Sequence, residues 1–75
     1  MTPEELHQAI LAAHDNEDRR SLVALYSEAA TRAEVAGDID ATCFFLTQAY
    51  VFALETGHRD AGKLHSRLRS HGREE

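Results

Sequence analysis

Histidine is the residue type in this chain that is best suited to chemistry, because imidazole binds transition metals and transfers protons near neutral pH. The sequence has five histidines among 75 residues. His7 and His14 are seven residues apart, as are His58 and His65, and on a helix this spacing separates them by roughly 10 Å, too far to share one ion. A metal site would need ligands from different helices, for instance His7 or His14 meeting His65 or His71 with Asp or Glu. We expect surface or half-buried histidines and no cofactor, with a small histidine-rich metal-binding protein as the alternative.

Cys43 is the other side chain with reactive potential. A catalytic cysteine needs a nearby histidine base and a lowered thiol pKa. Its sequence neighbours are Thr42 and Phe44, and it shares an apolar helical stripe with Ile39 and Leu46, which predicts a small core residue. The sequence also has no glycine-rich phosphate loop and no serine nucleophile elbow. We therefore expect a protein that is not an enzyme.

Aromatic side chains are better candidates for binding. Phe44, Phe45 and Phe52 fall in a segment with more apolar surface than three short neighbouring helices are expected to cover. Exposed aromatic residues anchor protein interfaces, so these residues are predicted to form a groove or a dimer seam. A role in the core is the alternative.

A second candidate binding group is basic. Arg59, Lys63 and Arg67 are spaced four residues apart and predict a ridge on one helix face, which would bind acidic side chains or a carboxylate. Residues 1–57 carry ten acidic and three basic side chains (−7), whereas residues 58–75 carry three acidic and five basic ones (+2). This basic segment either serves an acidic partner or lies on the acidic remainder of the fold.

Composition bounds the class of protein. A net charge of −5 argues against general nucleic-acid binding, because phosphate contacts need clustered Lys and Arg. No apolar run approaches the roughly 20 residues that cross a bilayer, and the acidic N-terminal residues do not resemble a signal peptide. We expect a cytoplasmic protein that binds neither membrane nor nucleic acid.

Apolar periodicity predicts one all-α domain, residues 1–75, with about four short antiparallel helices near 3–14, 18–36, 39–56 and 59–71. Thr2, Pro3 and Glu5 form a helix-start signal, and Gly37 and Gly57 are suited to helix ends. The helix at 39–56 is apolar around its circumference and is expected to be central. A domain of this size has a small core, so self-association or very regular packing is expected to support it.

The stretch from Tyr26 to Ala49 resembles one tetratricopeptide-type helical hairpin. The turn Ala36-Gly37-Asp38-Ile39-Asp40 matches the usual reversal of the family, and Tyr26 stands where the family prefers an aromatic residue. Thr42 and Leu46 depart from the pattern, since the family prefers alanine and an aromatic residue there.

The resemblance implies a right-handed stack of hairpins whose concave face binds a peptide or a helix of another protein. Such repeats usually number three or more, because each exposes apolar surface that the next one covers, so two hairpins would leave an uncovered end. We expect a small protein-interaction module that self-associates and has no catalytic activity. A purely structural homodimerisation module is the alternative.

Overall fold

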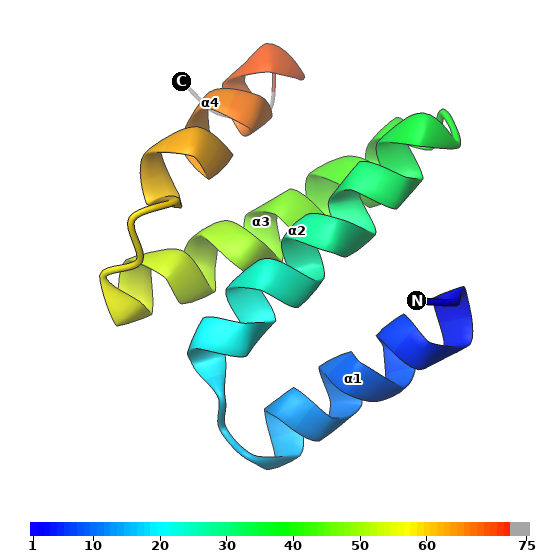
Figure 1. Cartoon of the computed structure of the whole chain (residues 1–75). Coiled ribbons are helices and arrows are strands. Elements are labelled where there is room, and N and C mark those ends of the chain that lie inside the picture. Colours follow the sequence, from blue (N-terminus) through cyan, green and yellow to red (C-terminus); the bar gives the residue numbers. More distant parts are fainter. Residues whose placement is uncertain (73–75) are drawn as a thin grey trace.

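The chain forms four helices, α1 (Pro3–Asp15), α2 (Arg19–Val35), α3 (Ile39–Thr56) and α4 (Ala61–Ser70), in a computed structural model that describes residues 1–72 (Figure 1). The predicted all-α fold is confirmed, and these described residues contain no strand. The fourth helix is shorter than the predicted range 59–71, because residues 58–60 are used in the connection. There the ring of His58 accepts the amide hydrogen of Asp60 on Nδ1 at 3.0 Å.

Side-chain caps explain where the first three helices begin. Thr2 and Glu5 form a capping box, in which the Thr2 hydroxyl accepts the Glu5 amide hydrogen at 3.1 Å and the Glu5 carboxylate accepts that of Thr2 at 2.9 Å. Asp18 and Asp38 cap α2 and α3 by accepting the amide hydrogens of Ser21 and Ala41. The hydrogen bond from the Thr2 amide lowers the pKa of Glu5, and those from the Ser21 hydroxyl (2.6 Å) and amide lower the pKa of Asp18, because each favours the charged carboxylate.

The helices end in turns with one left-handed residue. Gly37 (φ 80°) follows α2 and Gly57 (φ 63°) follows α3, as their positions in the sequence predicted. The turn after α1 has the same form, but its left-handed residue is Glu17 (φ 53°). Glu17 and Gly37 each donate to the carbonyl three residues earlier at 3.1 Å, and the aspartates that follow them donate to the carbonyl five residues earlier.

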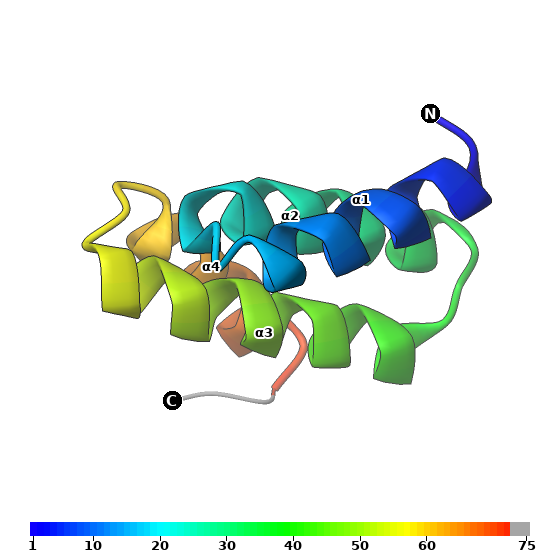
Figure 2. The same ribbon diagram turned by 90° about the horizontal axis from the view of Figure 1, so that it is seen from below.

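The antiparallel pair of α2 and α3 is the centre of the molecule, with α1 packed against α2 and α4 against α3. Figure 1 shows α1 and α4 on opposite sides of this pair, and in Figure 2 α1 and α2 lie above α3. The core is built from small and aliphatic residues, namely Val23, Ala30, Cys43, Leu46, Ala49, Ala53, Leu64 and Leu68. The chain measures 32 × 29 × 14 Å along its principal axes, so it is a thin slab with two broad faces.

Two departures from the expected pattern have clear physical reasons. Thr42, at a position where alanine was expected, is fully buried and donates its hydroxyl to the Asp38 carbonyl at 2.7 Å, so its polar atom is satisfied. Ala36 ends the predicted second helix (18–36) but is exposed and is the C-terminal cap of α2, which ends at Val35. Within residues 1–72, no helix is both long enough and apolar enough to cross a membrane.

Candidate interaction surface

Two of the three phenylalanines proposed for binding belong to an aromatic cluster between α1, α2 and α3. The ring of Phe52 stacks on that of Tyr26 at 6.1 Å and meets the ring of His14 edge-on at 5.8 Å. The ring of Phe45 also stacks on that of Tyr26, at 6.2 Å. Phe45 and Phe52 are half-buried and pack against the hydrophobic core. Their main contacts are therefore within the chain.

A hydrogen bond of 2.9 Å joins Nε2 of His14 to the hydroxyl of Tyr26 and closes the cluster on the α1 side. Partial burial raises the pKa of Tyr26, because the desolvated phenolate is disfavoured. His14 lies in the last turn of α1, as the predicted helix 3–14 requires, and its hydrogen bond joins this turn to α2. His14 therefore has a packing role.

Phe44 lies on a different face of α3. Its side chain is 57% exposed, and Val51 and Leu54 are 44% and 58% exposed. Residues 44, 51 and 54 fall on one helix stripe, with Thr47 and Gln48 between them. We call these five residues the outer face of α3. Among residues 1–72, no other helix covers Phe44, Val51 or Leu54 enough to bury them.

A shallow hollow of about 370 Å³ occupies the N-terminal half of this stripe. It is lined by Asp40, Cys43, Phe44, Thr47 and Gln48. Phe44, which lines this hollow, is as exposed as Leu54, and Val51 and Leu54 lie farther along the helix, outside the hollow. The hollow is therefore confined to the N-terminal half of the outer face of α3.

Sequence reasoning found Phe44 but missed Val51 and Leu54 as members of the same surface. The usable signal was their spacing from Phe44, seven and ten residues, which keeps all three on one side of a helix. Phe45 and Phe52 lie on another side of α3, where they are half-buried against Tyr26.

The three residues of the predicted basic ridge differ in position and exposure. Arg59 precedes α4, Lys63 is exposed on its first turn, and Arg67 is half-buried. Arg67 lies 3.7 Å from the carboxylate of Glu34 on α2 and donates to the Thr31 hydroxyl at 3.4 Å.

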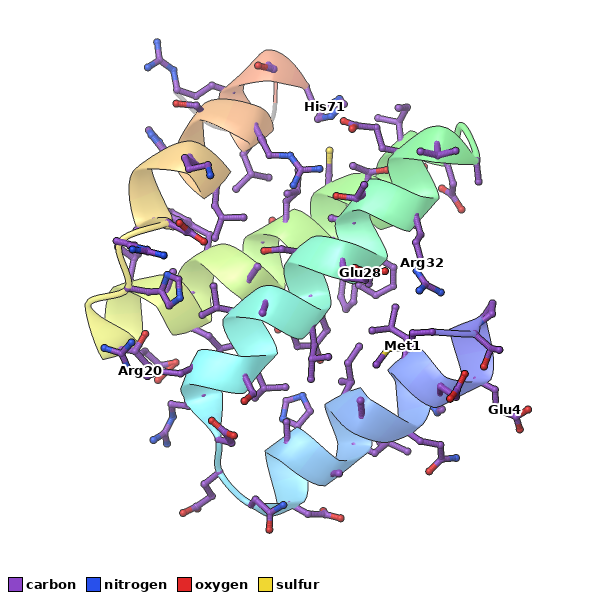
Figure 3. The ribbon with its side chains drawn as sticks, in the orientation of Figure 1. Met1, Glu4, Arg20, Glu28, Arg32 and His71 are labelled. Carbon is purple, nitrogen blue, oxygen red and sulfur yellow. The ribbon has the colours of Figure 1, made fainter. Side chains whose placement is uncertain are left out.

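His71, labelled in Figure 3, lies 3.0 Å from the other carboxylate oxygen of Glu34. Glu34 thus accepts contacts from two basic residues at the C-terminal end of the chain. This part of the basic segment therefore lies on the acidic remainder of the fold, which was one of the two alternatives stated from the sequence.

The remaining candidates for chemistry are dispersed. His65 stacks on Tyr50 at 5.4 Å, Cys43 is buried with a free thiol, and His7 is exposed on α1. Across residues 1–72, no three His, Cys, Asp or Glu side chains come together in a way that would hold a metal ion.

No family model matches the sequence, and neither the curated proteins nor the solved structures that were searched include a match. The resemblance to tetratricopeptide hairpins therefore stays a prediction. The candidate site rests on the exposure, shape and charge of the described residues alone.

Proposed function

We propose that this chain is a small, non-catalytic protein-interaction module that associates with a second copy of itself through the outer face of α3. The observation that carries the proposal is the exposure of Phe44, Val51 and Leu54 on a single stripe of the central helix. An exposed apolar stripe of this kind is typical of an interaction surface.

The shape of the outer face of α3 favours a second copy as the occupant. When two identical helices pack antiparallel about a two-fold axis near residues 47 and 48, residue 44 of each lies opposite residue 51 of the other. The exposed Val51 and Leu54 of one copy then face the N-terminal half of the other, where Phe44 and Thr47 line the hollow. The stripe is self-complementary in this arrangement.

The energy of this contact is modest. Phe44, Val51 and Leu54 are about half exposed, so burying the rest of each side chain contributes about 1 kcal/mol. The three side chains of both copies together contribute about 6 kcal/mol. Association costs about 4 kcal/mol or more in lost translational and rotational freedom. A weak dimer that forms as protein concentration rises is therefore expected.

The tetratricopeptide-like character of the module is part of the same proposal. It is supported by the antiparallel α2–α3 hairpin, by the Gly37-Asp38 reversal, and by the buried Ala29 and Ala30 where the two helices approach. We also assign the module to the cytoplasm, with the free thiol of Cys43 as support, because reducing compartments keep cysteines unpaired.

Light scattering coupled to size-exclusion chromatography tests the proposal directly. The wild-type mass is expected to rise from that of a monomer toward that of a dimer as the loaded concentration increases. Phe44→Asp is expected to keep the helical circular-dichroism spectrum and remain monomeric, because it introduces a charge into the contact and removes, within the chain, only the edge-on ring contact of Phe44 with Phe45 at 5.5 Å.

Leu11→Asp is the matched control. Leu11 is an apolar residue on α1 with 45% exposure, close to that of Val51, but it lies outside the outer face of α3. This variant should still dimerise. A wild-type chain that stays monomeric at every concentration would refute self-association, and equal loss of dimer in both variants would place the contact elsewhere.

A further inference from the structure

A hollow of about 510 Å³ lies where the connection between α3 and α4 passes the first turn of α2. Its lining residues are Arg20, Gly57, His58, Arg59 and Asp60. Figure 1 shows this connection and the first turns of α2 and α4 at the same end of the molecule, and Figure 3 shows Arg20 there. We call Arg20, His58 and Arg59 the cationic corner.

The two arginines of the cationic corner have no partner among residues 1–72: neither guanidinium forms an ion pair or a hydrogen bond. The adjacent Arg19 differs, because it lies 3.7 Å from the carboxylate of Glu55. Asp60 is the only acidic residue that lines the hollow, and its carboxylate lies 3.9 Å from the ring of His58. One carboxylate therefore faces two guanidinium groups, in a chain whose net charge is −5.

The positions of these arginines oppose the helix dipoles. The N-terminus of a helix carries partial positive charge, and α1 and α3 accordingly have acidic residues in their first turns. The first turns of α2 and α4 have none. Arg20 instead lies in the first turn of α2, and Arg59 lies just before Asp60, the residue that precedes α4. Asp18 and Asp60 supply one carboxylate at each of these N-termini, but Arg20 and Arg59 add positive charge beside them, which a bound anion would offset.

His58 supplies a third donor. Its Nδ1 accepts the backbone hydrogen of Asp60, so the neutral ring carries its own hydrogen on Nε2. Two guanidinium groups and one imidazole N–H match the terminal oxygens of a phosphate monoester, since arginine binds phosphate through paired N–H donors. The hollow has room for the phosphate together with part of the group that it esterifies.

We propose that the cationic corner binds a phosphate monoester, through Arg20, Arg59 and His58. This site is independent of the outer face of α3 and of the proposed self-association. The phosphate comes either from a small soluble ester or from a phosphorylated side chain of a partner, and the chemistry of recognition is the same for both.

Titration of the intact chain with inorganic phosphate tests the proposal, with binding followed by the NMR signals of the backbone amides at 57–61 and of the arginine side chains, at constant ionic strength. Saturable shifts confined to this region are expected. Arg20→Gln and Arg59→Gln should each weaken the fitted affinity by about tenfold, because each removes a charge-assisted contact.

Arg69→Gln is the control, because Arg69 is an exposed arginine of α4 that does not line this hollow. It removes the same charge and should leave phosphate affinity nearly unchanged. Shifts that do not saturate, or an equal loss of affinity in Arg69→Gln, would overturn the proposal by showing only general attraction of anions. Circular dichroism of each variant confirms that it is folded.

A short peptide with one phosphoserine distinguishes the two sources. Tighter binding of this peptide than of inorganic phosphate, with no binding of its unphosphorylated form, would support the site and assign it to a phosphorylated partner. Equal affinity for the peptide and inorganic phosphate would support the site and assign it to small soluble esters.

Discussion

Tyr26 lies where three helices meet, in contact with His14 of α1 and with Phe45 and Phe52 of α3. Its phenol ring stacks on the rings of Phe45 and Phe52, and its hydroxyl forms a hydrogen bond with His14. A single residue of α2 therefore contacts both α1 and α3. Its protonation state is coupled to stability, because burial favours the neutral phenol.

The raised pKa of Tyr26 predicts a loss of stability at alkaline pH. A group whose pKa is higher in the folded than in the unfolded chain stabilises the fold fully below its unfolded pKa, about 10 for tyrosine. That contribution disappears as the pH rises through the folded pKa. Tyr26→Phe should be less stable than wild type at pH 7, by about 0.5–1 kcal/mol for the lost hydrogen bond to His14. Above pH 10 this difference should shrink or change sign.

Urea unfolding of both proteins between pH 7 and pH 11.5 measures the effect. Lysine and arginine titrate equally in wild type and variant, so the difference in free energy of unfolding isolates Tyr26. Tyr50→Phe serves as the control for removal of a phenol elsewhere, since Tyr50 stacks on His65 and lies outside the cluster of Tyr26. A difference between wild type and Tyr26→Phe that stays constant to pH 11.5 would contradict the assignment.

At the scale of elements, the same turn geometry ends α1 and α2. In each, a left-handed residue is followed by an aspartate that caps the next helix. Gly37 adopts this conformation at no steric cost, whereas Glu17 has a Cβ that crowds its own backbone. The first turn therefore contains strain that the second does not.

Replacing Glu17 by glycine is expected to stabilise the protein by about 0.5–1 kcal/mol, because the strain removed exceeds the extra freedom that glycine gives the unfolded chain. Gly37→Ala should destabilise it by about 1 kcal/mol, although no atom lies within 4 Å of the added Cβ, so the loss reports backbone strain alone. Chemical denaturation measures both changes. Glu17→Gln separates the effect of charge from that of conformation, and a destabilised Glu17→Gly would show that unfolded-chain entropy dominates.

The number of helices, the capping box at Thr2 and the two glycine ends were predictable from sequence, because each depends on interactions between residues close together in the chain. The left-handed conformation of Glu17 was not, since nothing in its residue type favours it. The role of Arg67 was also open, because its partner Glu34 is distant in sequence and the meeting depends on how α4 packs.

The candidate surface was predictable only in part for a related reason. The sequence grouped Phe44 with Phe45 and Phe52 as candidates for one groove or dimer seam, and it did not show which side of the helix its neighbours cover. That depends on where α1 and α4 lie around α3, which the structure supplies. The cationic corner depends in the same way on the approach of Arg20 to residues 57–60.

At the scale of the whole molecule, the thin slab limits stability. With a dimension of only 14 Å in one direction, the core is a single layer of side chains between α2 and α3, flanked by the contacts of α1 and α4. Small domains gain little net stability from such a core. Any association that covers the outer face of α3 would therefore contribute a large share of the total free energy of unfolding.

This dependence predicts that the melting temperature of the wild-type chain rises with protein concentration. For a weak dimer this rise begins once the concentration exceeds the dissociation constant, and a hundredfold increase above that point stabilises the dimer by about 2.7 kcal/mol, which corresponds to a rise of about 8 °C for two chains of this length. Val51→Asp should abolish the concentration dependence while keeping a cooperative transition, because Val51 is 44% exposed and outside the core cluster. Leu11→Asp on α1 should retain it. Thermal melts by circular dichroism across that range measure the effect, and a wild-type melting temperature that is flat with concentration would show that the fold is stabilised within one chain alone.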